Sequence, residues 1–105
     1  MDNILVTVII TTYDRPDDLS RALSSVVNQT YKNLEILVID GKGLNETLEV
    51  VEEFQSKDNR ILYLAYKNED KTTIYGDVQH ARNIALRYAN GKYVAMLDDD
   101  DYWRP

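Results

Sequence analysis

Cysteine is absent from this chain of 105 residues, and several other informative residue types are rare. Without cysteine there is neither a disulfide framework nor a thiolate metal site. Only four glycines and two prolines are present, so a Pro/Gly-rich linker is not expected. No apolar run approaches the roughly 20 residues that a membrane-spanning helix needs. Any direct link to a membrane would therefore have to come from sequence outside this chain.

Positive charge is also scarce, because 12 Lys and Arg residues face 18 Asp and Glu residues, for a net charge of -6. This balance argues against unaided binding of nucleic acid or of an anionic membrane surface. An anionic ligand such as a nucleotide would need a metal ion or local basic groups. The first residues, Met1-Asp2-Asn3, lack the basic start of a signal peptide. We therefore expect a cytoplasmic protein, with membrane association left to sequence outside the chain.

The remaining residues alternate between strand-like and helix-like patterns. A length of 105 residues and an apolar fraction of 44% fit a single domain over 1–105. Alternating strands and helices predict an α/β fold in three layers, with a mostly parallel sheet and right-handed crossovers. We expect about four strands, at 5–10, 34–39, 61–66 and 93–97, and three helices, at 16–27, 45–54 and 78–89, the last ended by Gly91 as a left-handed cap.

Polar segments follow three of the expected strands, at 11–15, 40–45 and 98–101. In open parallel sheets, ligands bind beyond the carboxyl ends of the strands. The sequence therefore predicts a ligand site where these three segments meet.

The segment "LDDDDYW" at 97–103 places four carboxylates after an apolar strand. Asp98 and Asp100 are two residues apart, so on an extended backbone both would point the same way. Mg²⁺ is often shared between one or two carboxylates and the phosphates of a substrate. The alternative is a solvated acidic loop. An EF-hand is disfavoured, because its sixth position needs glycine and Trp103 stands there.

The other two strand ends each allow two interpretations. Thr11, Thr12 and Tyr13 belong either to a ligand-facing turn or to an ordinary connection into a helix. This turn contains no glycine, so it is not a phosphate-cradling glycine loop. Asp40 could accept a hydrogen bond from a base or ribose, or it could cap the turn before Gly41.

Two residues of the third expected helix are candidates of a different kind. The single histidine, His80, fits a surface position better than a catalytic one. Arg82 could contact phosphates or the acidic run. Its alternative is a surface arginine paired with Asp77 or Asp101.

Taken together, these segments resemble the N-terminal, nucleotide-sugar-binding half of the family 2 glycosyltransferases, which have the Rossmann-like GT-A fold. The matching stretches are "VTVIITTYDRPDDLSRALSSVVNQTYKNLEILVID" at 6–40 and "GDVQHARNIALRYANGKYVAMLDDDDYW" at 76–103. Each piece alone is weakly specific. Their order, their spacing and the Asp-x-Asp after the fourth strand make the combination specific.

The resemblance implies a role for each matching position in binding a nucleotide-diphosphate sugar with Mg²⁺ or Mn²⁺. The turn after the first strand would flank the base, and the metal would bridge the diphosphate. The implied nucleotide-sugar contacts are Thr11, Thr12, Tyr13 and Asp40 around the base, Arg82 near the diphosphate and Asp99 at the ribose. The implied metal residues are Asp98 and Asp100, with Asp100 as the direct ligand.

This sequence also departs from the family pattern. After the second strand the family usually has two acidic residues followed by Gly-Ser, whereas here Asp40 precedes Gly41-Lys42-Gly43. The missing carboxylate puts uridine specificity in doubt. The family's catalytic base and acceptor site come after the Asp-x-Asp. We therefore expect an incomplete GT-A domain that binds the donor, with the catalytic base outside the chain and an unknown saccharide, lipid or protein acceptor.

We expect the glycosyltransferase to invert the configuration at the sugar, because the family tends to do so. Two other functions compete with this prediction. The first is a non-catalytic nucleotide-binding or assembly module with the same fold. The second is a nucleotidyltransferase, which is weakened by the lack of a glycine-rich basic loop after the first strand. Apolar surface left uncovered could also lead to self-association. Metal-dependent binding of a nucleoside diphosphate would favour the glycosyltransferase.

Overall fold

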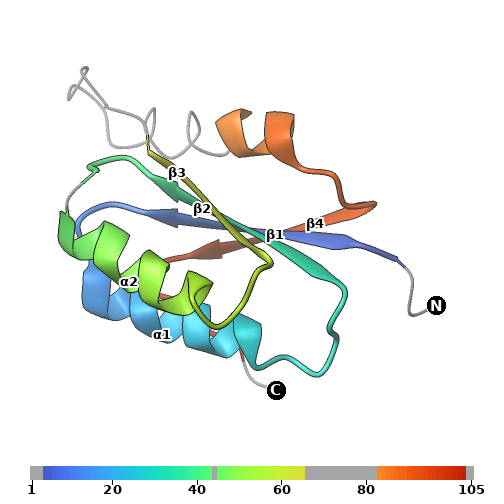
Figure 1. Ribbon diagram of the computed structural model, residues 1–105. Helices are drawn as coiled ribbons and strands as arrows, with labels where there is room; N and C mark the ends of the chain where they lie inside the picture. The colour runs from blue at the N-terminus through green and yellow to red at the C-terminus, as the bar shows by residue number, and fades with distance from the viewer. Residues whose placement is uncertain (1–3, 44, 66–82, 104–105) are drawn as a thin grey trace.

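The computed structural model describes residues 4–43, 45–65 and 83–103. These residues form a parallel sheet with the strand order β3-β2-β1-β4 (Figure 1). The prediction of an α/β fold with a parallel sheet of about four strands is confirmed. The strands are β1 (Val6–Thr12), β2 (Leu34–Asp40), β3 (Ile61–Ala65) and β4 (Tyr93–Asp98).

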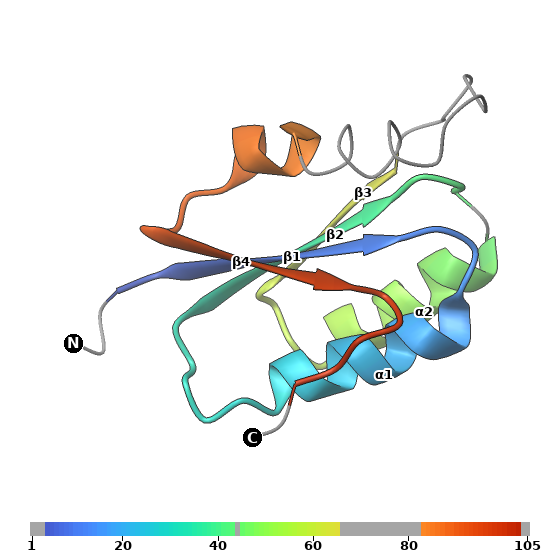
Figure 2. The same cartoon turned by 180° about the vertical axis from the view of Figure 1, so that it is seen from behind.

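Helices cover both faces of the sheet, which gives the three predicted layers. α1 (Pro16–Val27) and α2 (Asn45–Gln55) lie side by side on one face. Residues 83–88 are helical and lie on the opposite face (Figures 1 and 2). They form part of the helix predicted over 78–89, of which 78–82 fall outside the described residues. No helix in the described part of the chain is both long and apolar enough to cross a membrane.

The core lies on both faces of the sheet, because alternate residues of each central strand point in opposite directions. Burial on both faces explains why the central strands read as continuous apolar runs. The face toward α1 and α2 buries Val8, Ile10, Ile36 and Val38 against Leu19, Leu23, Val26 and Val51, and the other face buries Ile9, Leu37 and Ile39 against Ala85.

The two strands that lead to the predicted site are longer than expected. β1 continues through Thr11 and Thr12, which were predicted to lie in a turn, and β4 includes Asp98. Both extensions are stabilised by pairing, since Thr11 is in register with Asp98 and Thr12 with Asp40. The connection from β1 to α1 is therefore only three residues long, and Asp14 within it has a φ of 54°.

Gly91 is not the left-handed helix cap that was predicted. Among the described glycines, a positive φ occurs at Gly43, where it is 74°, and not at Gly91. A Cβ atom on Gly91 would lie 2.5 Å from the backbone nitrogen of Thr7 and 2.9 Å from the carbonyl oxygen of Leu5. The Gly91 N–H donates a hydrogen bond of 2.8 Å to Thr7 Oγ1. Glycine is required here for close approach to β1.

A hydrogen-bonded group of four residues lies at the amino end of the sheet and is here called the amino-end clamp. It consists of Thr7, Glu35, Asn90 and Gly91. Glu35 accepts hydrogen bonds of 2.9 Å from Thr7 Oγ1 and from both the backbone and the side chain of Asn90. Partial burial acts to raise the pKa of Glu35, but the hydrogen bonds from Asn90 and Thr7 outweigh it and the pKa is lowered. The clamp joins β1 and β2 to the segment that enters β4.

Candidate metal and nucleotide site

The site lies at the point of the sheet where the order of strand addition reverses. Along the chain, β2 and β3 are added on one side of β1, and β4 is added on the other. The carboxyl ends of β1 and β4 lie side by side at this switch point, which is where open α/β sheets bind ligands. The aspartate run begins at the end of β4.

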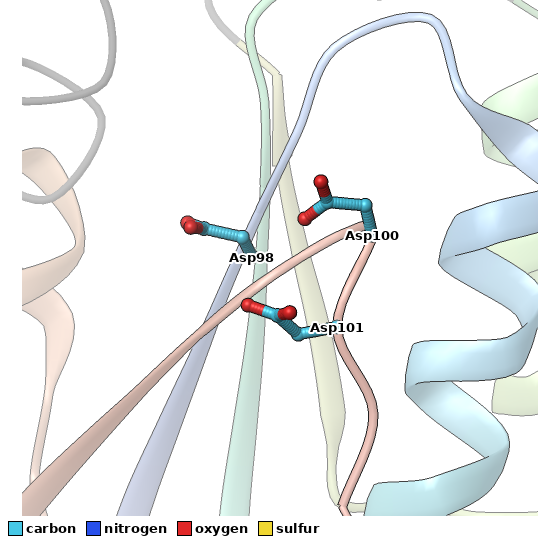
Figure 3. Close-up of side chains that lie close together, drawn as sticks. All are labelled: Asp98, Asp100 and Asp101. Atoms are coloured by element: carbon cyan, nitrogen blue, oxygen red, sulfur yellow. The ribbon is translucent and has the colours of Figure 1, made fainter.

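Asp98, Asp100 and Asp101 form an acidic cluster at the end of β4. One carboxylate oxygen from each lies within 4.8 Å of the other two, and the three carboxylates point to the same side of the strand end (Figure 3). A backbone turn produces this arrangement, because the Asp101 N–H donates a 3.0 Å hydrogen bond to the Asp98 carbonyl oxygen. The spacing of the run predicts only Asp98 and Asp100 as the metal pair. The turn adds Asp101 to the group.

The acidic cluster fits a hard divalent cation. Ligand oxygens at about 2.1 Å from Mg²⁺ lie about 3 to 4 Å from one another in an octahedron. The oxygens of the cluster are near this range, and solvent reaches them, so small side-chain rotations would complete the geometry. Carboxylates at such spacing repel one another by about 1 kcal/mol per close pair in water. A cation would remove this repulsion.

Asp99 differs from its three neighbours because it is buried, with 7% of its surface exposed. Its Oδ2 accepts hydrogen bonds of 3.0 Å from Thr12 Oγ1 and 3.3 Å from the Tyr13 N–H. Burial raises the pKa of Asp99, although the two hydrogen bonds and the nearby Arg15 oppose the shift. The Asp99 side chain thus fastens the end of β4 to the end of β1, and its contact with a ribose stays a prediction.

Among the described residues, Arg15 is the positive group nearest the aspartates, and it was not among the predicted site residues. Its Nη1 lies 3.6 Å from Asp99 Oδ1 and 3.5 Å from Asp100 Oδ2, and about half of its side chain is exposed. A signal was available, because Arg15 is a basic residue in one of the three polar strand ends predicted to meet. Only the sheet topology places it opposite the aspartates.

The two threonines of β1 support the aspartates. Thr11 Oγ1 donates a 3.3 Å hydrogen bond to Asp98 Oδ1, in parallel with the bond from Thr12 to Asp99. Tyr13 follows with a partly exposed ring, and Lys42 Nζ lies 5.6 Å from its centroid. The structure therefore brings the predicted residues of the first and fourth strands together, with the threonines directed at carboxylates.

Asp40 adopts the capping alternative. It is fully buried, and its Oδ1 accepts hydrogen bonds from the N–H groups of Lys42, at 2.9 Å, and Gly43, at 3.1 Å. Its Oδ2 accepts a 2.6 Å hydrogen bond from the Tyr63 hydroxyl. Burial and this hydrogen bond raise the pKa of Tyr63. Asp40 shapes the loop after β2, and a base could reach its carboxylate only if that loop rearranged.

The aromatic residues after the aspartates anchor the run to α1. The Trp103 N–H donates a 3.0 Å hydrogen bond to Ser25 Oγ, and the Trp103 ring packs against the core. The guanidinium of Arg21 lies 5.0 Å from the centroid of the Tyr102 ring. Two other candidates, His80 and Arg82, lie outside the described residues, so their predicted roles are untested.

A comparison with protein families identifies the chain. The model of glycosyl transferase family 2 matches residues 7–105. The chain belongs to this family. The resemblance inferred from the sequence is thereby confirmed.

Two relatives from Escherichia coli are named glucosyltransferases. The chain is 42% identical over 103 residues to UDP-Glc:alpha-D-GlcNAc-diphosphoundecaprenol beta-1,3-glucosyltransferase WfgD, covering 98% of this chain and 38% of that protein. It is 36% identical over 99 residues to WfaP, which carries the same activity name, covering 94% of this chain and 36% of that protein. The chain thus spans somewhat over a third of the length of these relatives.

Solved structures agree with the fold of this family 2 chain. A mannosyltransferase from Pyrobaculum calidifontis, in complex with GDP-Man and Mn²⁺, superposes with a TM-score of 0.76 at 26% identity, covering 95% of this chain and 28% of that one. TarS of S. aureus in complex with UDP superposes with a TM-score of 0.73 at 29% identity, covering 92% and 28%. The first of these holds a divalent metal together with a nucleotide sugar.

Proposed function

We propose that this chain is the donor-binding part of a glycosyltransferase that uses a nucleotide-diphosphate sugar. The observation that carries the proposal is the acidic cluster at the β1–β4 switch point of a family 2 chain. Mg²⁺ or Mn²⁺ would be held by Asp98 and Asp100, with Asp101 as a third carboxylate within reach. A cation held there would stabilise the charge that develops on the departing nucleoside diphosphate.

The remaining residues of the site would position the donor. Tyr13 exposes 42% of its surface beside the cluster and offers an aromatic face near the base. The threonines hold the aspartates in place, and Asp40 fixes the shape of the loop after β2. We propose that Asp99 and Arg82 contact the ribose and the diphosphate. The group that deprotonates the acceptor would come from outside residues 1–105.

The names of the relatives narrow the donor and the acceptor. UDP and GDP-Man are bound in the two solved structures, and the two glucosyltransferases are named for a diphosphoundecaprenol-linked acceptor. We propose UDP or GDP as the donor nucleotide and a lipid-linked saccharide as the acceptor. The reaction would take place at the cytoplasmic side of a membrane, with inversion at the sugar.

Metal-dependent nucleotide binding tests the proposal. Isothermal titration of UDP and of GDP, each with and without Mn²⁺, should give binding only when the metal is present. Asp100→Asn should weaken Mn²⁺ binding by about tenfold or more, since it removes a charged ligand. Asp18→Asn is the matched control, because it removes an exposed carboxylate on α1 that pairs with Arg21.

The outcomes of this titration separate the two functions. Nucleotide binding that ignores both the metal and Asp100→Asn would instead favour a non-catalytic nucleotide-binding module. One observation favours that module. The carboxylate of Asp40, at the end of β2, is buried and already accepts hydrogen bonds from the Lys42 N–H and the Tyr63 hydroxyl, so it does not face a base. No binding of either nucleotide under any condition would overturn both functions.

We also infer that the chain by itself associates through β4. This strand lies at the edge of the described sheet and exposes 58% of Tyr93, 39% of Val94 and 43% of Met96. An apolar edge strand is a template for pairing with another strand. Sedimentation velocity should show a concentration-dependent dimer, which Met96→Lys should weaken by several-fold. A monomer at all concentrations up to about 1 mM would contradict this inference.

A further inference from the structure

Arg15 faces two neighbouring carboxylates with one nitrogen atom. Its Nη1 lies 3.5 Å from Asp100 Oδ2 and 3.6 Å from Asp99 Oδ1. The residue stands immediately before α1, at the end of the short connection from β1. Its guanidinium therefore lies at the carboxyl end of the sheet, against one member of the acidic cluster.

Asp100 belongs both to the Arg15 ion pair and to the acidic cluster. A divalent cation bound to Asp100 would bring a second positive group to the same carboxylate. The two cations would repel each other over a few ångströms, so the guanidinium would have to leave Asp100 as the metal binds. In the absence of a nucleotide, Arg15 thus competes with the metal.

A nucleoside diphosphate would remove the competition between Arg15 and the metal. Arg15 has 53% of its side chain exposed, so the guanidinium is free to turn away from the cluster. Its planar set of N–H donors matches a phosphate group in a bidentate arrangement. A diphosphate shared with the metal would stand beside the same carboxylate that Arg15 had left, within reach of the displaced guanidinium.

We propose that Arg15 is an exchangeable counter-ion of the acidic cluster. It neutralises Asp100 when the site holds no metal, and it pairs with the diphosphate once the metal and the nucleotide are bound. This inference rests on the proposed function. Its consequence is that metal and nucleotide bind together more readily than metal alone, because the diphosphate gives the displaced guanidinium a new partner.

The test measures two affinities that this exchange drives in opposite directions. Arg15→Gln should bind Mn²⁺ alone about threefold more tightly than the wild type, because the competing cation is gone. With saturating Mn²⁺, the same variant should bind UDP or GDP about tenfold more weakly, because a charged hydrogen-bond donor to the diphosphate is lost. Both affinities come from isothermal titration of the folded protein, with circular dichroism to confirm folding.

Two further variants separate the exchange from a general charge effect. Arg87→Gln makes the same charge change at an exposed position three residues before Asn90 of the amino-end clamp, and it should leave both affinities within about twofold of the wild type. Arg15→Lys keeps the charge but lacks the planar fork, so it should restore the competition with Mn²⁺ and only part of the nucleotide affinity.

Three results would overturn the proposal. The first is weaker Mn²⁺ binding by Arg15→Gln, which would make Arg15 a support of the metal site. The second is unchanged nucleotide affinity in that variant, and the third is an equal response of Arg87→Gln. In each case wild-type binding of Mn²⁺ and nucleotide would leave the proposed function standing, whereas a wild type that binds neither would remove both.

Discussion

At the amino end of the sheet, the carboxylate of Glu35 accepts three hydrogen bonds, whereas at the carboxyl end Asp98, Asp100 and Asp101 stand together with oxygens within 4.8 Å. The first carboxylate is stabilised by donors that the fold itself provides. The second group contains like charges that the fold brings together. Glu35 lies on β2 and Asp98 on β4, the two strands that flank β1 in the sheet.

The difference indicates which end of the sheet serves stability and which serves function. Unfavourable local arrangements in natural proteins concentrate at functional sites, where a ligand offsets them. The amino-end clamp has no such arrangement, because its donors and acceptors satisfy one another. The acidic cluster and the buried Asp99 are unfavourable arrangements of this kind, and they lie where ligands of α/β sheets bind.

The largest expected effect comes from breaking the clamp at Gly91. Gly91→Ala would place a Cβ atom 2.5 Å from the Thr7 nitrogen and 2.6 Å from Thr7 Oγ1, so backbone must move. We expect the free energy of unfolding to fall by about 3 kcal/mol, as measured by urea denaturation. Gly43→Ala is the matched control, because open space surrounds Gly43 and only its φ of 74° is unfavourable. That change should cost about 1 kcal/mol. Equal losses in both would show that the clamp does not depend on close approach.

The next effect concerns the charge of Glu35. Its folded-state pKa is lowered from 4.5, so the carboxylate contributes stability above that pH, and this contribution is lost as the pH falls through the folded pKa. Glu35→Gln should lower the free energy of unfolding at pH 7 by about 1 kcal/mol at most, because the network is partly exposed. The deficit relative to the wild type should shrink below pH 4.5 in denaturation curves recorded against pH.

The smallest effect has the opposite sign and lies at the other end of the sheet. Burial raises the folded-state pKa of Asp99 above 3.8, so its charge costs stability above the folded pKa, and this cost disappears as the pH falls toward 3.8. Asp99→Asn, studied with a chelator present, should raise the free energy of unfolding at pH 7 by less than about 1 kcal/mol. The gain should vanish in acid. A loss of stability at pH 7 would mean that Arg15 and the hydrogen bonds outweigh burial.

Much of the fold could be predicted from the residues because its signals are local. Continuous apolar strands alternating with amphipathic helices require a parallel sheet covered on both faces. Pro16 with two following aspartates placed the start of α1 at the correct residue. The prediction for Gly91 was wrong because a left-handed cap is a local property, whereas the contact with Thr7 joins positions 84 residues apart.

The candidate site was only partly predictable, for the same reason. The run of aspartates is visible in the sequence, and the period-two argument selected Asp98 and Asp100. A turn after β4 then brought Asp101 to the group and buried Asp99. The sequence shows Arg15 only as a basic residue at a strand end and gives no sign of Tyr63, because the importance of both comes from the strands that lie beside them.

The sequence by itself determined that this is an α/β chain with acidic residues at the end of its fourth strand, since hydrophobic periodicity and charge are properties of neighbouring residues. Only the tertiary structure decided how those carboxylates differ. Asp99 turns inward to Thr12, Asp100 faces Arg15, and Asp40 is enclosed by its own loop. These outcomes depend on the strand order β3-β2-β1-β4, which sets distant segments side by side and is not encoded in any single stretch of the chain.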